Sequence, residues 1–186
     1  MEGIHLNGEF HYQFGGPICA AGFKQTSEDF IVDEWLEVEP DGAGEHLLLH
    51  LRKRNMNTQY VARHVARVCG VRERDVSFCG MKDRVAVASQ WFSVHLPGTD
   101  FENYQALSCE GLTLISSARH GRKLRRGAHS GNRFRIVLRA LSADPAMMEE
   151  RLSQLRDQGF PNYFGEQRFS RADNEALNNQ ERAAER

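Results

Sequence analysis

The stretch Phe78–Gln90, FCGMKDRVAVASQ, decides how the rest of the chain is interpreted. A short apolar run and a glycine precede a single carboxylate, Asp83, and an alternating apolar run, Val85–Leu96, follows it. Apolar runs on either side of a polar loop predict two strands, and reactive residues are often placed on such loops. Lys82 and Arg84 flank Asp83, and nearby positive charge favours an ionised carboxylate. From these residues alone, Asp83 is either a reactive carboxylate or a turn residue in a surface ion pair.

The hydrophobic pattern elsewhere predicts mainly β-strands. Two apolar runs between Glu28 and Leu51 flank the turn sequence Pro40–Gly44, which predicts a hairpin. Short apolar or alternating runs predict further strands over residues 18–24, 76–79, 85–96, 111–117 and 132–140. Helices are predicted from Asn57 or Thr58 to Gly70 and from Asp144 to Gly159. We therefore expect an α+β fold, in which helices flank a mostly antiparallel mixed sheet.

The composition argues against several classes of protein. The 186 residues are 40% hydrophobic and 26% charged, as in ordinary globular domains. No apolar run reaches the ~20 residues of a membrane helix, and the first residues do not resemble a signal peptide. The four cysteines form no C-x-x-C pair, and His46 and His50 fall on a predicted strand. We expect no metal ion, no membrane contact, free thiols and a cytoplasmic location.

The net charge of −1 hides two charged segments of opposite sign. Residues 28–45 contain eight acids and no Lys or Arg, whereas residues 119–139 contain eight Lys or Arg and no acid. The densest basic part is Arg122, Lys123, Arg125 and Arg126, which predicts contacts with RNA phosphates. Two alternatives are a solvated basic loop, and two segments that neutralise each other as neighbouring strands.

Two further motifs contain side chains that could contact a nucleotide. Asn132 and Phe134 follow Gly131 at the start of a predicted strand. The amide could bind a base edge, and the ring could stack on a base, which is worth roughly 1–3 kcal/mol. Phe30 lies in the second of these motifs, EDFIV, on another predicted strand. A turn asparagine and core phenylalanines would explain the same residues without any ligand.

Four motifs, in the same order, resemble those of the TruD family of tRNA pseudouridine synthases. The similarity extends from about Glu28 to Arg171. The motifs are EDFIV from Glu28, GMKDRVAV from Gly80, GNRF from Gly131 and FPNYFGEQRF from Phe160. Together they are far more specific than any one of them.

The resemblance implies an activity and a set of site residues. Asp83 would be the catalytic residue that isomerises uridine, expected at position 13 of tRNA, to pseudouridine. The reaction involves no redox change, so no cofactor is expected. The target base must leave its stack to be reached. Substrate contacts are expected from Phe30, Lys82, Asn132 and Phe134, and RNA contacts from Arg84, Arg122, Lys123, Arg125 and Arg126. The expected partner is tRNA, and a complete protein is expected to be a monomer.

The apolar pattern ends after Arg171, since residues 172–186 contain one leucine and no aromatic residue. We expect residues 1–159 to form an incomplete catalytic domain and residues 160–186 to begin a truncated inserted domain. Such a chain is expected to be poorly active or inactive by itself. A non-catalytic RNA-binding relative is the competing class of protein. A structural protein with no nucleic-acid role would not explain the segregated charge.

Overall fold

The computed structural model describes residues 12–161 and divides the chain into two compact units. The larger unit, residues 21–141, holds the main sheet and helix α1 (Thr58–Val68). The smaller unit combines residues 1–20 and 142–186 and holds helix α2 (Pro145–Gln158). No helix within residues 12–161 is long and apolar enough to cross a membrane.

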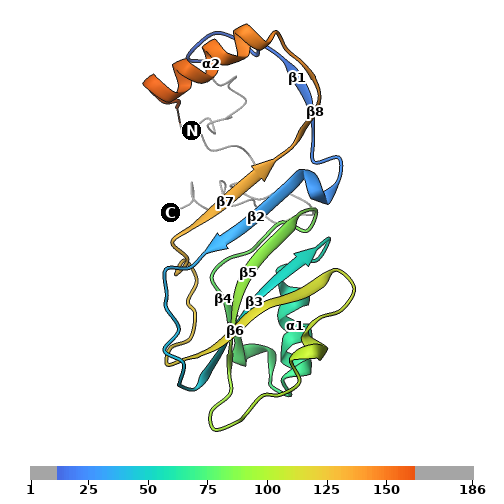
Figure 1. The fold of residues 1–186 in the computed structure, drawn as a ribbon, viewed down its shortest axis with the longest axis vertical. Helices are drawn as coiled ribbons and strands as arrows, with labels where there is room; N and C mark the ends of the chain where they lie inside the picture. Colours follow the sequence, from blue (N-terminus) through green and yellow to red (C-terminus); the bar gives the residue numbers. More distant parts are fainter. Residues whose placement is uncertain (1–11, 162–186) are drawn as a thin grey trace, which may run out of the picture. The chain divides into compact units, whose positions relative to one another are not determined.

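Within the described residues, the main sheet has six strands. They are β2 (Phe30–Trp35), β3 (His46–Arg54), β4 (Val76–Phe78), β5 (Val87–His95), β6 (Leu112–His120) and β7 (Gly131–Ile136). Five of them lie in the order β6-β3-β5-β2-β7, and β4 pairs with β5 (Figure 1). Only β2 and β5 are parallel to each other. Strands β1 (Ala20–Phe23) and β8 (Leu138–Ser142) form a separate two-stranded sheet. The predicted α+β class, with a mostly antiparallel mixed sheet, is confirmed.

The predicted hairpin between Glu28 and Leu51 is wrong, because β5 lies between β2 and β3. Ile31 of β2 is paired with Val87, while β3 pairs with the other edge of β5 along its whole length. β5 is buried along most of its length, and its Phe92 is fully buried. An apolar strand excludes more water at the centre of a sheet than at its edge. The strand predicted over residues 132–140 is also divided, into β7 and β8.

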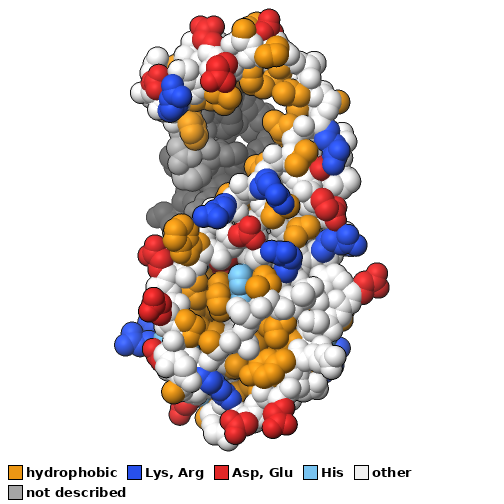
Figure 2. Space-filling view, in the orientation of Figure 1, with side chains coloured by type: hydrophobic (Ala, Val, Ile, Leu, Met, Phe, Trp, Pro, Cys, Tyr) orange, Lys and Arg blue, Asp and Glu red, His pale blue; other side chains and the backbone are white. Residues whose placement is uncertain are grey.

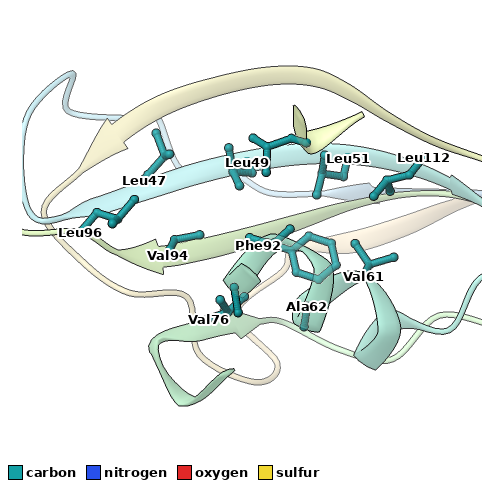
Figure 3. Close-up of a cluster of buried hydrophobic side chains, with 13 residues drawn as sticks. Leu47, Leu49, Leu51, Val61, Ala62, Val76, Phe92, Val94, Leu96 and Leu112 are labelled. Atoms are coloured by element: carbon teal, nitrogen blue, oxygen red, sulfur yellow. The ribbon is translucent and has the colours of Figure 1, made fainter. Parts of the chain in front are cut away.

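The hydrophobic core lies between the sheet and helix α1 (Figure 3). Successive side chains of a strand point to opposite faces. Leu49 of β3 therefore packs with Val61 of α1 and Phe92 of β5 on one face. Leu48 faces the other side, where it packs with Leu124 from the segment before β7. Both faces of the sheet are thus covered near its centre, which fixes the strands that carry the site.

The two predicted helices are confirmed. Helix α1 begins after Asn57, and Gly70 follows its last turn with a φ of +66°, a conformation that favours glycine. Helix α2 begins after Asp144, whose Oδ1 accepts a hydrogen bond from the backbone N of Ala146 at 2.7 Å. The motif that starts at Phe160 falls almost entirely outside the described residues, as does most of the predicted inserted domain, residues 160–186.

An ion pair between Asp29 and Arg139 connects the start of β2 to β8. Asp29 is almost fully buried, and both of its carboxylate oxygens accept hydrogen bonds from Arg139. The shorter of these joins Nη2 to Oδ1 at 2.7 Å. These bonds lower the pKa of the Asp29 carboxyl to about 2. The folded chain therefore holds Asp29 ionised to a lower pH than the unfolded chain does.

We expect this ion pair to stabilise the fold above about pH 4 and to lose its effect as the pH falls towards 2. A carboxyl whose pKa is lowered by folding stabilises the protein above its unfolded pKa, near 3.8. Urea unfolding of the parent and of Arg139→Gln between pH 2 and 6 measures the effect. The difference in unfolding free energy should be constant above pH 4 and shrink below it. A difference that stays unchanged down to pH 2 would contradict this assignment.

Candidate active site

Asp83 lies in the loop between β4 and β5, and its side chain is 43% exposed. Its carboxylate Oδ2 accepts a hydrogen bond from Nζ of Lys24, which directly follows β1. The same ammonium group lies 3.7 Å from the centroid of the Phe30 ring, within the range of a cation–π contact. Lys24 thus holds the carboxylate beside an aromatic ring.

The backbone of Lys24 is unusual. Its φ of +52° falls in the left-handed region, which residues other than glycine seldom adopt. Such conformations persist where the surrounding contacts hold them, and they are concentrated at functional sites. Here the ion pair with Asp83 and the contact with Phe30 are side-chain interactions that hold Lys24 in place.

A buried lysine holds the main chain of the Asp83 loop. Lys53 of β3 is only 1% exposed, and its Nζ donates hydrogen bonds to the carbonyl oxygens of Asp83 and Met56, both at 2.7 Å. Burial lowers the pKa of Lys53 to about 8, against the opposing effect of the Asp83 charge. The position of the Asp83 backbone therefore depends on a buried side chain near the end of β3.

Because of Lys53, the unfolding free energy is expected to increase as the pH rises from 8 to above 10. The unfolded chain keeps the Lys53 proton up to its ordinary pKa of 10.5, whereas the folded chain releases it near 8. At about 1.4 kcal/mol per pKa unit, the parent should gain about 3 kcal/mol over Lys53→Met between pH 8 and pH 10.5. Urea unfolding of both proteins at pH 7 to 10.5 tests this, and parallel stability curves would refute it.

Lys82 does not flank the Asp83 carboxylate in the way that the sequence suggested. Its Nζ forms an ion pair with Glu34 of β2, and the two side chains are 6% and 0% exposed. Glu34 Oε1 also accepts a hydrogen bond from the backbone N of Trp91 at 3.0 Å. This geometry assigns Lys82 to holding the loop against the sheet, and it does not support the substrate contact that we predicted for Lys82. Lys24 supplies the positive charge at Asp83 instead.

A hydroxyl and an amide complete the support of this loop. The backbone N of Lys82 donates to Oγ1 of Thr58, at the first turn of α1, at 3.0 Å. That hydroxyl donates in turn to Gln90 Oε1, also at 3.0 Å, and Gln90 Nε2 donates to the carbonyl oxygen of Gly80. Arg84, by contrast, is exposed, and no ion pair involves it within residues 12–161. It is available for the RNA contact that we predicted.

Three of the predicted substrate residues lie on β2 and β7, which are paired. Phe30 and Phe134 have ring centroids 5.8 Å apart, and the Phe134 side chain is 55% exposed. Asn132 lies opposite Glu34 in the strand register, and its Oδ1 is buried without a hydrogen-bond partner among the described residues. Buried polar atoms normally have a partner. The strand pair thus offers an exposed ring and an unused amide oxygen, and Phe30 links them to the Lys24–Asp83 ion pair.

The basic segment follows β6 and is anchored to the sheet at two points. The backbone N of Leu124 donates to Ser93 Oγ at 3.0 Å, and that of Gly127 donates to the Cys79 carbonyl oxygen at 2.7 Å. Around these anchors the side chains of Arg122, Lys123, Arg125 and Arg126 are all exposed. No ion pair involves these four within residues 12–161.

The two charged segments neutralise each other only in part. β2 and β7 are neighbours, with Asp33 opposite Arg133, and Asp29 is paired with Arg139. The alternative that the two charged segments meet as neighbouring strands is therefore correct for β2 and β7. Figure 2 shows Lys and Arg side chains gathered over the β2–β7 region on the face in view. The exposed Arg133 and Arg135 of β7 contribute to the positive charge of the unit.

Sequence reasoning missed Lys24, Lys53 and Glu34. Lys24 and Asp83 are 59 residues apart, and Lys53 and Asp83 are 30 apart. No local spacing can indicate such contacts. The available signal for Lys53 was the strand alternation, which puts it on the same face as Leu51 and the buried leucines before it.

The comparisons with known proteins agree with the four motifs. A family model described as tRNA pseudouridine synthase D (TruD) matches residues 7–174. The tRNA pseudouridine synthase D of Pseudoalteromonas translucida is 48% identical over 163 residues, which are 88% of this chain and 46% of that protein. The protein of the same name from Methylococcus capsulatus is 48% identical over 155 residues, 83% of this chain and 44% of that protein.

A solved structure also matches. The crystal structure of a Methanosarcina mazei protein, described as a putative tRNA pseudouridine synthase D, aligns with a TM-score of 0.66 and 30% identity. The alignment covers 80% of this chain and 35% of that one. The chain spans about half the length of the curated relatives it matches. Since the family model covers more than half of its residues, this chain belongs to the tRNA pseudouridine synthase D (TruD) family.

Proposed function

We propose that this chain carries the catalytic aspartate of a tRNA pseudouridine synthase, which converts uridine in tRNA to pseudouridine, with position 13 as the expected site. The observation that carries the proposal is the Lys24–Asp83 ion pair beside Phe30 and Phe134. It places an exposed carboxylate next to an aromatic surface. Membership of the TruD family supports the choice of reaction.

The reaction requires the N1–C1′ bond of uridine to break and a C5–C1′ bond to form. Asp83 is the group that can act as a nucleophile or a base, and both roles need an ionised carboxylate. Lys24 holds that carboxylate in place, and Lys53 holds its backbone. The isomerisation involves no net redox change, so the proposed chemistry needs no cofactor.

The uridine must leave its stack to reach Asp83, at a cost of a few kcal/mol. Phe134 is exposed and can stack on the extruded base, and Phe30 supports it from the neighbouring strand. The Oδ1 of Asn132, which has no hydrogen-bond partner among the described residues, can accept a hydrogen bond from an N–H of the base. Arg84 and the basic segment are proposed to bind the phosphates of the same tRNA, in the cytoplasm, with a complete protein acting as a monomer.

The first test measures pseudouridine by mass spectrometry in unmodified tRNA incubated with an excess of this chain. Product formation would support the whole proposal and show that residues 1–186 suffice. The absence of both product and tRNA binding would contradict it. Binding without product would leave a chain with an RNA-facing surface and an incomplete site. In that case a chimera tests the catalytic assignment. Residues 24–141 of this chain replace the corresponding segment of a complete relative. A chimera that folds but is inactive would reject the assignment.

A further inference from the structure

Three histidines form a row across three neighbouring strands at the end of the sheet distant from Asp83. His46 of β3 lies opposite His95 of β5 and His120 of β6 in the strand register. Residues opposite each other on neighbouring strands project from the same face. The ring centroids of His46 and His95 are 5.0 Å apart. Along β3, His46 is seven residues from Lys53, which is roughly 23 Å at 3.3 Å per residue.

His46 lies where two cavities meet. The larger cavity, about 1200 Å³, is lined by His46 and His120 together with Arg122, Lys123 and Arg125 of the basic segment. The smaller, about 220 Å³, is lined by His46, His95, Arg74 and Lys123. His46 and Lys123 line both cavities, which therefore adjoin each other and together make up the groove along the histidine row.

The acids that face this groove are mostly engaged. Oδ2 of Asp41 accepts a hydrogen bond from the backbone N of Gly121 at 2.9 Å and lies 2.8 Å from His120 Nδ1. Asp75 is bound by Arg72, which lowers the pKa of the Asp75 carboxyl. The remaining carboxylates at the groove and its rim, among the described residues, are Glu37, in the larger cavity, and Glu45, 3.4 Å from His95.

The central histidine has an unused polar atom. Nδ1 of His46 is buried and has no hydrogen-bond partner among the described residues. Buried polar atoms normally have one, in protein or in a bound molecule. Lys123 and Arg74 are free of ion pairs within residues 12–161, so the unengaged charges of the groove that His46 lines are mainly positive. The chemistry that fits is an anion with several acceptor oxygens.

We propose that the groove along His46 and Lys123 binds a phosphate of the RNA backbone, at a distance from Asp83, and that this binding strengthens as the pH falls. The proposal rests on the proposed function for its choice of RNA, since a tRNA that enters the Asp83 site extends well beyond one nucleotide. Phosphate contacts position a nucleic acid without reading its sequence. The groove would therefore set the orientation of the tRNA.

The pH dependence follows from the charges around His46. Burial, followed by the nearby His95, lowers the pKa of His46, and Lys123 and His120 act in the same direction, while Glu45 opposes them. His46 in the free protein is therefore neutral near pH 7. A phosphate beside it would favour the charged imidazolium and raise its pKa. Binding then takes up a proton, so acidification increases affinity over the range between the two pKa values.

The experiment measures the affinity of this chain for fluorescently labelled tRNA between pH 5 and 7.5 at constant ionic strength. A pKa change of one unit predicts about tenfold tighter binding at the acid end. His46→Gln should remove most of this gain, whereas His64→Gln, on helix α1, should keep it. An equal pH dependence in the parent and in His46→Gln would overturn the proposal.

A second pair of variants tests the phosphate contact at one pH. Lys123→Gln should weaken tRNA binding and reduce the slope of log affinity against log salt by about 1. The matched control is Arg63→Gln, an exposed cation of α1, which should leave both quantities unchanged. Equal effects of the two variants would overturn the proposal. Pseudouridine formation is measured separately. Binding that depends on pH and on His46 supports the proposed phosphate site even if no product forms. Product formation without that dependence rejects the phosphate site and leaves the proposed function standing.

Discussion

Asp83→Asn is expected to abolish pseudouridine formation while tRNA affinity stays within about twofold of the parent. The substitution keeps the size of the side chain and an oxygen that can accept from Lys24, but it removes the negative charge. A catalytic acid, base or nucleophile typically contributes at least 10²–10⁴-fold to the rate. The measurement is single-turnover product formation together with a tRNA titration, made in this chain or, if it is inactive, in the active chimera.

The matched control for this experiment is Asp100→Asn. Asp100 is an exposed carboxylate in the segment after β5, and its substitution should leave both rate and affinity unchanged. Either of two results for Asp83→Asn would mean instead that Asp83 is needed for the fold: a loss of tRNA affinity as steep as the loss of rate, or a melting temperature markedly lower than that of Asp100→Asn. The catalytic assignment would then be wrong.

Lys82→Met is expected to produce the largest loss of stability in this region, about 3–5 kcal/mol of unfolding free energy. The substitution leaves the carboxylate of Glu34 fully buried and without its cation, and breaking a buried ion pair typically costs this much. Replacing both partners should cost much less, because a neutral amide is easier to bury than a lone charge. Lys82→Met/Glu34→Gln should therefore recover most of the loss, since the introduced amide oxygen could still accept from the Trp91 backbone. Urea unfolding of the single and double variants measures both effects.

An exposed ion pair provides the comparison. Nη1 of Arg54 lies 3.0 Å from Oε1 of Glu28, and the two side chains are 58% and 52% exposed. Solvent screens such a pair, so Arg54→Met should cost no more than about 1 kcal/mol. If Lys82→Met and Arg54→Met cost the same, Glu34 is not held in a water-excluded site. The support that we assign to the Lys82–Glu34 pair would then be absent.

Local patterns were enough to predict the helices and most of the strands. Apolar spacing and Gly70 define α1, and the alternating run after Asp83 becomes β5. The order of strands was not predictable in this way, because two apolar runs joined by a turn signal give no sign that a later strand will come between them. The hairpin prediction failed for that reason: β5 lies between β2 and β3 and pairs with both.

The candidate site shows the same division. Asp83, Phe30 and Phe134 could be chosen from motifs, and the structure brings Asp83 and Phe30 together through Lys24. The roles of the lysines depend on tertiary contacts. Neighbours in sequence suggested that Lys82 attends Asp83, whereas the contact belongs to Lys24, which is distant in the sequence. Charge beside a carboxylate in the sequence is a poor guide to charge beside it in space.

The position of β5 between β2 and β3 has a consequence for synthesis of the chain. β2 ends at Trp35, but its two neighbours begin only at Val87 and Gly131. A chain leaving the ribosome therefore carries β2 with both edges unpaired for about fifty residues, and with one edge unpaired for about a hundred. Unpaired edges invite association with other chains, and like charge discourages it. The eight acids of residues 28–45 surround this strand, so their mutual repulsion between nascent chains protects β2 during the interval in which it has no partner.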